Sequence, residues 1–278
     1  MIRQDTVYAL AGAGDTLYAA RASGLYRSRD GGATWINTFA PLEQGPLAAV
    51  SVAAHGQSVF AGVNGAVLRS HDAGETWQIA GLAAPPPLVT ALALSPDFDG
   101  TIFAGTAEDG VFISTDRGET WVAWNFGLLD LHVYALAVSP DFGRDRTVYV
   151  GTETGVFVSR NGGRGWRETA FPMDAAPVLS LGLTDLLLAG TEARGLYISE
   201  DGGTSWGQVD LPSGAIHAIQ REPHLAVLLE NGLARSDDSG RSWALAASFQ
   251  QTALAMLADL PHAFLVGFDD GEIARITL

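Results

Sequence analysis

Acidic residues recur at one position of a repeated strand pattern in this 278-residue chain, in the loop that follows the second strand of most repeats. Carboxylate oxygens that converge from several loops can surround a hard cation or attract a positively charged peptide. The pattern therefore predicts a cation-binding or cationic-peptide-binding surface, with plain solvation of the turns as the alternative. The candidate binding residues in these loops are Glu108, Asp109, Glu153, Glu192, Arg194, Glu230, Asp269 and Asp270.

The connections between successive repeats bring three further carboxylates to the same end of the strands, Glu43, Asp130 and Asp174. Trp124 precedes one of these connections. An exposed indole at this place would be a binding residue, and burial of the ring between neighbouring repeats is the alternative.

Other kinds of chemistry lack the residues that they require. The chain has no cysteine and no lysine, which excludes disulfides, thiol catalysis and lysine Schiff bases. Its six histidines show no His-x-x-x-His spacing for a metal, and neither a glycine-rich phosphate loop nor a serine nucleophile elbow is present. We therefore expect no cofactor and no resident metal.

The charge of the chain limits its partners. A formal net charge of −15 opposes binding to nucleic acid or to an anionic membrane, and favours a cationic partner. No apolar run approaches the roughly 20 residues of a membrane span. The first ten residues lack the basic and then apolar layout of a signal peptide, so we expect a cytoplasmic protein, or an extracytoplasmic one if a leader was removed.

A short motif, written S-x-D-x-G-x-x-W, positions all of these loops. It occurs at residues 28–35, 70–77, 114–121, 159–166, 199–206 and 236–243, with successive serines 42, 44, 45, 40 and 37 residues apart. We call each copy a box. Its acidic residue can accept turn amides, its glycine supplies a positive φ, and its tryptophan opens the next strand. The acceptors are Asp30, Asp72, Asp116, Asn161, Asp201 and Asp238, and the closing residues are Trp35, Trp77, Trp121, Trp166, Trp206 and Trp243.

Three runs of alternating apolar residues precede each box, and a fourth begins at its tryptophan. This period-2 pattern between glycine turns predicts strands, and no stretch carries a helical period. A seventh set of three runs follows the last box and has no box of its own. Repeated four-stranded sheets of this length predict an all-β, seven-bladed β-propeller that forms a single domain over residues 1–278.

Small residues are expected where the innermost strands crowd around the axis. The third position of each innermost strand is alanine or serine, and the position before it varies among the repeats. We place the small residues at Ala9, Ala49, Ala91, Ala135, Ser180, Ala218 and Ala255.

The six boxes resemble the Asp-box, or bacterial neuraminidase, repeat. That resemblance implies a propeller whose boxes lie on the face opposite an active site. The whole chain is also similar to single-propeller photosystem assembly and stability factors, which implies a protein partner and an interaction scaffold. Those factors grip their partner with an arginine-rich surface, whereas the loops between second and third strands are acidic here, so that ligand does not carry over.

The resemblance to sialidases implies three substrate-binding arginines, a tyrosine nucleophile with a glutamate partner, and an acidic proton donor. The Arg-Ile-Pro element of that family is absent, and only Arg3, Arg21 and Arg194 are expected near the acidic loops. Tyr8 and Tyr134 are the only candidate nucleophiles and lack an identifiable glutamate partner. Similar xyloglucanases place their carboxylates between two propellers. We therefore predict a non-catalytic scaffold, with a glycoside hydrolase or lectin that uses the acidic loops as the alternative.

The last blade is expected to be incomplete. Its third strand is followed by no box, and too few residues precede the first strand of blade one to cross about three interstrand gaps and pair there. The sequence predicts a three-stranded seventh blade with Glu272 to Thr277 as its edge. Such an edge can recruit a strand from a protein partner or a second copy, and the alternative is a monomer whose edge Arg275 protects.

Overall fold

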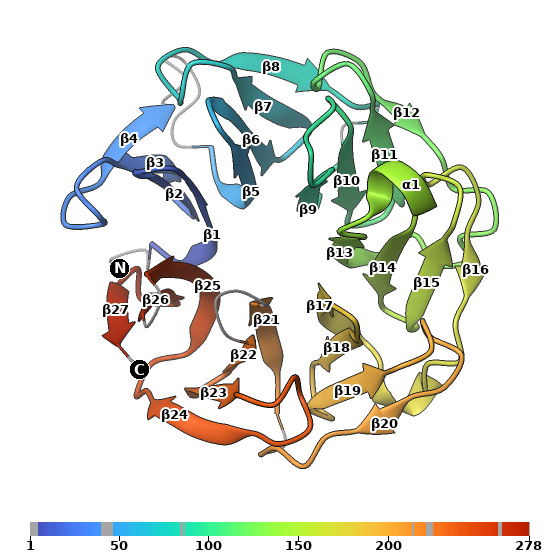
Figure 1. The fold of residues 1–278 in the computed structure, drawn as a ribbon. Coiled ribbons are helices and arrows are strands. Elements are labelled where there is room, and N and C mark those ends of the chain that lie inside the picture. The colour runs from blue at the N-terminus through green and yellow to red at the C-terminus, as the bar shows by residue number, and fades with distance from the viewer. Residues whose placement is uncertain are drawn as a thin grey trace.

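Seven antiparallel sheets lie radially around a central axis in the computed structural model, which describes residues 5–39, 47–83, 85, 87–212, 214–220, 225–260 and 263–277 (Figure 1). Within these residues six sheets have four strands and the last has three. The chain is a seven-bladed β-propeller with a three-stranded seventh blade, as the repeats predict. Arg3 and Glu43 lie outside the described residues.

Each blade runs from the axis outward in chain order. The strands of the first three blades are β1 (Val7–Ala13), β2 (Thr16–Arg21), β3 (Gly24–Ser28) and β4 (Ile36–Phe39); β5 (Ala49–His55), β6 (Ser58–Val63), β7 (Ala66–Ser70) and β8 (Gln78–Gly81); and β9 (Val89–Leu94), β10 (Ile102–Thr106), β11 (Val111–Ser114) and β12 (Val122–Ala123).

The next four blades repeat this order. They contain β13 (Val133–Val138), β14 (Val148–Thr152), β15 (Val156–Ser159) and β16 (Arg167–Glu168); β17 (Val178–Leu183), β18 (Leu187–Thr191), β19 (Leu196–Ser199) and β20 (Gly207–Gln208); β21 (Ile216–Gln220), β22 (Leu225–Leu229), β23 (Gly232–Ser236) and β24 (Ala244–Ser248); and β25 (Ala253–Leu260), β26 (Ala263–Phe268) and β27 (Ile273–Thr277).

Two short helical segments lie in loops where the sequence predicts none. They are α1 (Phe142–Asp145) and the 3-10 turn η1 (Met173–Ala175). In α1, the buried Phe142 ring packs edge-on against Phe103 at 5.6 Å between centroids, so the blade core holds the turn. No helix among the described residues has the length and apolar character that crossing a membrane requires.

Each box is a turn that its acidic residue holds by hydrogen bonds. In the fifth box Ser199 Oγ donates to Asp201 Oδ1 and accepts the Gly203 N–H, at 2.9 and 2.8 Å. Ser205 donates its N–H to Asp201 Oδ1 and its hydroxyl to Oδ2, at 2.8 and 2.7 Å. In four other boxes the residue four positions after the aspartate likewise donates its N–H and its hydroxyl to the carboxylate. These aspartates are Asp30, Asp72, Asp116 and Asp238.

The box tryptophans pack back over the turn. A Cβ added to Gly74 would lie 3.1 Å from the Trp77 ring, so glycine is needed where the indole crosses the backbone. Trp206 meets Phe171 edge-on at 5.0 Å, and Trp77 meets Phe39 at 6.5 Å. The fourth strands begin one residue after the tryptophan, not at it as the sequence analysis expects.

Blades lock together where one blade's glycine receives the next blade's β-branched side chain. A Cβ added to Gly105 would lie 2.5 Å from Val133 Cγ1, and one added to Gly267 would lie 2.5 Å from Val7 Cγ1. The same pairing joins Gly62 to Val89, Gly151 to Val178 and Gly190 to Ile216.

At two blade interfaces the glycine is replaced by a larger residue and the β-branched residue by alanine. The positions equivalent to the glycine are Ala20 and Leu228, because their neighbours on the innermost strands are Ala9 and Ala218. The next blades begin with Ala49 and Ala253, each fully buried. A larger residue on one side therefore accompanies a smaller one on the other, which keeps the interface at native packing density.

The pairing corrects one sequence assignment. In blade two, Ala49 pairs with Val63 and is equivalent to Val7, whereas Ser51 faces Gly62 and holds the small position near the axis. The register shift at Val50 matches the one at Tyr8. A shift by two residues preserves which side chains face inward, so the alternation pattern alone does not reveal it.

The ring closes through contacts of the same kind between blades seven and one. Besides Val7 in the Gly267 notch, Thr6 Oγ1 donates to the Asp269 carbonyl at 2.9 Å, and Arg275 donates to the Gly31 carbonyl at 2.7 Å. Arg275 therefore reaches the first box, as Arg27 reaches the second through Ala73 at 2.8 Å. Among the described residues, β27 pairs only with β26.

We expect Gly105→Ala to lower the free energy of unfolding by about 1–3 kcal/mol, because the new methyl overlaps Val133. Val133→Ala in the same chain should recover part of that loss, since the two-alanine pair already occurs at Ala20 and Ala49. Gly81→Ala, where no atom lies within 4 Å of the added Cβ, is the control. Urea denaturation of Gly105→Ala, of Val133→Ala alone, of the double variant and of Gly81→Ala measures the coupling, and additive effects would contradict this packing account.

We also expect acid to destabilise the fold through the boxes. Hydrogen bonds from the Ser205 hydroxyl and N–H hold the pKa of Asp201 at about 2, and the Thr34 hydroxyl does the same for Asp30. A pKa below the unfolded value of about 3.9 stabilises the fold above that pH, and the contribution is lost as pH falls toward 2. The urea midpoint should drop over that window, and Asp201→Ala should lower it at neutral pH and flatten the drop. A midpoint that is constant down to about pH 2 would contradict this role.

Candidate functional site

The acidic loops of blades three to six form the candidate site. The chain alternates direction along each blade, so loops after second strands and connections to the next blade emerge at one end. We use the name acidic face for the carboxylates of Glu108, Asp130, Glu153, Glu192 and Glu230, which leave these loops. All of them are exposed except Asp130, which is only 8% exposed.

Asp130 ties the connection from blade three to the loop of blade four. Its Oδ1 accepts the His132 N–H at 3.0 Å and lies 3.0 Å from His132 Nδ1. Its Oδ2 accepts the Thr154 N–H and hydroxyl at 2.8 and 2.9 Å. Burial alone would raise the pKa of Asp130, but the bonds from His132 and Thr154 outweigh it and lower that pKa. A buried carboxylate with four such contacts is a fixed negative charge.

His132 links this fixed charge to Glu153. Its Nδ1 lies 3.4 Å from Glu153 Oε2, and the ring is half-exposed. The hydrogen bond to Asp130 raises the pKa of His132, and the charges of Glu153 and Glu108 add to the effect. His132 is therefore a proton-binding group that lies between the carboxylates of Asp130 and Glu153.

The negative field extends across the neighbouring blades. Burial raises the pKa of Tyr134, and the charges of Glu153, Asp130 and Glu192 raise it further. Burial lowers the pKa of His217, while Glu230 and Glu192 oppose that change. The charge of Glu192 thus raises the pKa of Tyr134 and opposes the lowering of the pKa of His217 by burial.

The remaining predicted residues of these loops are held through their backbone. Asp109 donates its N–H to Thr106 Oγ1, and its carbonyl accepts Asn125 Nδ2 at 2.9 Å. The Arg194 carbonyl accepts Gln208 Nε2 at 2.8 Å, and its guanidinium reaches Asp174 at 4.0 Å. Hydrogen bonds therefore fix the loops and leave the side chains of Asp109 and Arg194 exposed.

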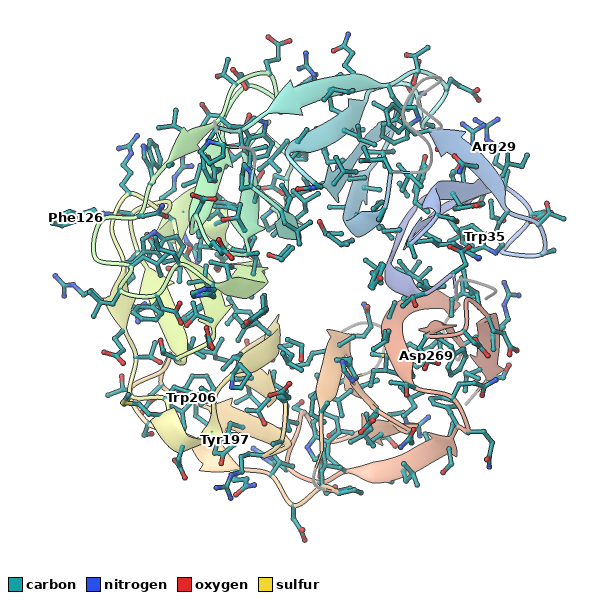
Figure 2. All side chains as sticks on the ribbon, turned by 180° about the vertical axis from the view of Figure 1, so that it is seen from behind. Arg29, Trp35, Phe126, Tyr197, Trp206 and Asp269 are labelled. Atoms are coloured by element: carbon teal, nitrogen blue, oxygen red, sulfur yellow. The ribbon has the colours of Figure 1, made fainter. Side chains whose placement is uncertain are left out.

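Asp269 takes part in closing the ring, and Asp270 holds the turn before β27. The Asp269 carbonyl accepts the Thr6 hydroxyl, and Asp270 Oδ1 accepts the Glu272 N–H at 3.0 Å. Figure 2 shows Asp269 beside the junction of blade seven with blade one. Their contacts are accounted for by the turn before β27, so we leave them out of the acidic face.

Trp124 packs between blades. It is half-buried against the core of blades three and four, with the Arg164 guanidinium 5.2 Å from its ring centroid. Its carbonyl accepts the Trp166 indole N–H at 2.7 Å. The ring is thus partly buried at the interface of blades three and four, and it also lines a cavity together with Asn161 and Arg164.

Three groups of the site were not assigned from the sequence. His132 was among the histidines without metal spacing, yet its ligand atom and those of Asp130 and Glu153 all lie within 4.8 Å of one another. Tyr134 is considered in the sequence analysis only as a candidate nucleophile, and His217 only as one of the variable positions of the innermost strands. The Asp-x-His spacing in a connection that leads directly into a strand is the signal that would have found His132.

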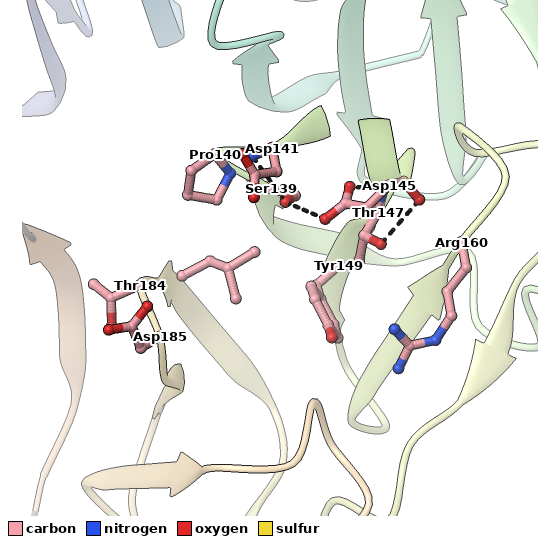
Figure 3. A pocket seen from close by; sticks show the side chains of 10 residues that line it. Ser139, Pro140, Asp141, Asp145, Thr147, Tyr149, Arg160, Thr184 and Asp185 are labelled. Carbon is pink, nitrogen blue, oxygen red and sulfur yellow. Dashed lines mark hydrogen bonds between the residues drawn. The ribbon is translucent and has the colours of Figure 1, made fainter. Parts of the chain in front are cut away.

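The opposite face has a cavity of about 540 Å³ between blades four and five (Figure 3). Figure 3 shows Tyr149 and Arg160 on one side of it and Asp185 on the other. Asp145, also in its lining, accepts the Ser139 hydroxyl and the Thr147 N–H at 2.6 and 2.8 Å. These bonds hold the loop, so Asp145 serves structure at this position.

Comparison with known proteins identifies the repeat and the fold. The family model for the BNR/Asp-box repeat matches residues 112–123, which comprise most of β11, the third box and the whole of β12. No curated protein sequence matches the chain.

Several solved structures share the propeller. The structure titled "YCF48 bound to D1 peptide" is 17% identical with a TM-score of 0.77, covering 100% of this chain and 93% of that one. The extracellular domain of a putative hybrid two component system from B. thetaiotaomicron is 14% identical, with a TM-score of 0.79 and coverage of 98% and 40%. The GH74 xyloglucanase from Xanthomonas campestris is 18% identical, with a TM-score of 0.74 and coverage of 99% and 52%. At these identities the likeness establishes the fold alone.

We expect Asp130→Asn to lower the pKa of His132 toward its ordinary value of about 6.5, because the variant removes the charge that stabilises the imidazolium. NMR titration of the imidazole protons measures the change. His217 is the internal control, since Glu230 and Glu192 surround it and its pKa should stay the same. An unchanged His132 titration, or an equal shift at His217, would contradict the geometry described.

Proposed function

We propose that the chain is a non-catalytic scaffold whose acidic face binds a positively charged segment of a protein partner. One observation carries the proposal: five carboxylates leave the loops of four neighbouring blades at the same end of the propeller, and four of them are exposed. Two of the five, Asp130 and Glu153, lie 3.0 and 3.4 Å from His132 Nδ1. A continuous field of one sign attracts a ligand of the opposite sign and speeds its association.

Apolar groups beside the carboxylates suit lysine or arginine side chains. Tyr134 is 36% exposed, and Leu131 and Leu88 are exposed to a similar extent. Lysine and arginine bury their aliphatic stems on such surfaces while their charged ends meet carboxylates, and the face of a tyrosine ring attracts cations. The acidic face thus offers apolar groups for the aliphatic stem of a lysine or arginine and carboxylates for its charged end.

The likeness to YCF48 supports this proposal by analogy of architecture. That protein is described as bound to a D1 peptide, and this chain spans 93% of its length. A single propeller of this size therefore presents enough surface for a peptide. The identity of the peptide and the surface that holds it are not transferred from that protein.

A carbohydrate-active protein is the alternative from another class. The chain spans about half the length of the GH74 xyloglucanase to which it is similar. The discriminating observation is turnover: hydrolysis of a xyloglucan oligosaccharide or a fluorogenic sialoside that is lost in Glu108→Ala and Glu153→Ala would replace the scaffold proposal.

The edge of β27 is the other surface through which a partner could bind. A partner strand there would pair with main-chain groups of Ile273 to Thr277, which the sheet order leaves at the outside of blade seven. Ile276→Pro removes an amide donor and distorts this edge. Partner binding that survives in folded Ile276→Pro excludes the edge.

We expect a peptide of alternating lysine and leucine to bind the protein, with an affinity that falls steeply as salt rises from low to physiological concentration. The triple variant Glu153→Gln, Glu192→Gln, Glu230→Gln should weaken binding at least about tenfold, because it removes three exposed charges of the acidic face. Isothermal titration calorimetry measures both effects.

The matched control is Glu200→Gln, which removes an exposed carboxylate from the box of blade five on the opposite face. It should leave peptide affinity unchanged. Salt-independent binding, or equal losses in the triple variant and in Glu200→Gln, would show that the acidic face is not the binding surface.

A further inference from the structure

The fourth box differs from the other five in charge. Its acceptor is Asn161, and the residue four positions on is Gly165, where the other boxes have serine or threonine. Asn161 Oδ1 accepts the Ser159 hydroxyl and the Gly165 N–H, at 2.8 and 3.0 Å. The box therefore keeps its turn without a carboxylate and without the hydroxyl that the carboxylate binds elsewhere.

Asn161 keeps an uncovered donor as a result. Its oxygen makes the turn bonds, so its Nδ2 group has two N–H donors left over. A Cβ on residue 165 would lie 3.5 Å from Nδ2, and glycine leaves this side of the amide open.

The connection that follows blade three packs across this box. Trp166 donates its backbone N–H to the Phe126 carbonyl at 2.8 Å and its indole N–H to the Trp124 carbonyl at 2.7 Å. Trp166 is buried to 4% exposure, whereas Phe126 is 85% exposed. Figure 2 shows Phe126 at the rim of the ring, with its side chain directed outward.

A cavity of about 410 Å³ lies between this aromatic ring and the box. Phe126, Asn161 and Gly165 contribute to its lining together with three arginines, Arg160, Arg164 and Arg167. A neighbouring cavity of about 280 Å³ shares Asn161 and Arg164 and adds Arg146. Arg164, Arg167 and Arg146 thus line the two cavities beside the one box that has no carboxylate. The Arg160 guanidinium points to the fifth box, because its Nη2 would lie 3.3 Å from a Cβ on Gly202.

None of Arg160, Arg164 and Arg167 lies within 4.0 Å of a carboxylate oxygen in the described part of the chain. Arg164 packs over Trp124, and the Arg160 guanidinium lies beside Gly202, to whose carbonyl the Tyr149 hydroxyl donates at 3.3 Å. In a chain of net charge −15, by contrast, Arg27 and Arg29 both pair with Glu75. The arginines of this cavity are therefore not paired with a carboxylate of the described residues.

We propose that this cavity binds a small ligand that joins a phosphate monoester to a flat ring, of the nucleoside monophosphate class. Guanidinium groups match phosphate oxygens with charge-assisted, bidentate hydrogen bonds, and the Asn161 amide adds a neutral donor. Phe126 provides a surface on which a base stacks. A cavity of this volume suits a ligand of that size.

Adenosine monophosphate, adenosine and inorganic phosphate are the probes, measured by isothermal titration calorimetry on the full chain. The monophosphate should bind at one site and more tightly than either of its parts. Arg164→Gln and Arg167→Gln should each weaken it about tenfold, because each removes a charge-assisted bond. Phe126→Ala should weaken the monophosphate and leave phosphate binding unchanged.

Asn161→Asp is the sharpest variant, because it restores the carboxylate that five boxes carry and so retains the fold. We expect it to weaken binding of the monophosphate at least about tenfold through like-charge repulsion. Arg241→Gln is the matched control, since Arg241 holds the box position of Arg164 but lies beside Asp238 in blade six. Thermal unfolding confirms that each variant is folded.

Failure to bind the monophosphate, an unchanged affinity in Asn161→Asp, or an equal loss in Arg241→Gln would overturn the proposal. Equal affinity for inorganic phosphate and the monophosphate, with no effect of Phe126→Ala, would overturn its flat-ring part. The proposal does not depend on peptide binding at the acidic face. Glu153→Gln, which changes that face, should therefore leave the affinity for the monophosphate unchanged.

Discussion

The ring depends on the contact between a glycine on one blade and a β-branched side chain on the next. Gly105 and Val133 show why: no Cβ fits at the glycine, so the neighbouring blade can approach closely enough to bury its valine fully. Where the glycine is replaced, as by Leu228, the facing residue shrinks to alanine. At five of the seven interfaces, including the pair of blades that closes the ring, a glycine receives a valine or isoleucine of the next blade. At the other two the facing residue is alanine.

This packing sets what the two ends of the blades can do. The boxes lie at one end, where carboxylates accept turn N–H and hydroxyl groups and are thereby committed to structure. At the other end the loops are held by main-chain bonds and by threonine hydroxyls such as Thr106 Oγ1, so most glutamates there are left exposed. The geometry of the repeat therefore gives acidic residues two roles. At one end of the blades they stabilise turns, and at the other they make a surface negatively charged.

The sequence predicts the strand order, the seven blades and the box turns because each rests on local spacing. It misplaces Ser51, since a two-residue shift leaves the inward-facing pattern intact. It also misses His132, because the approach to Glu153 depends on how two loops from different blades fold against each other. The sequence shows that the fourth box has Asn161 and Gly165 where the other boxes have aspartate and a hydroxyl residue. The binding site inferred there depends on the cavity beside the box, which the sequence does not reveal.

The most direct test of the account is hydrogen–deuterium exchange with and without a lysine-rich peptide bound. If the acidic face is the binding surface, amides of residues 107–110, 130–134, 152–155 and 191–194 gain protection, since these loops carry its carboxylates. The boxes, such as residues 199–206, and the edge strand 273–277 keep their free-state exchange rates. Protection confined to the boxes or to that edge would contradict the claim that this propeller binds its partner through the acidic face.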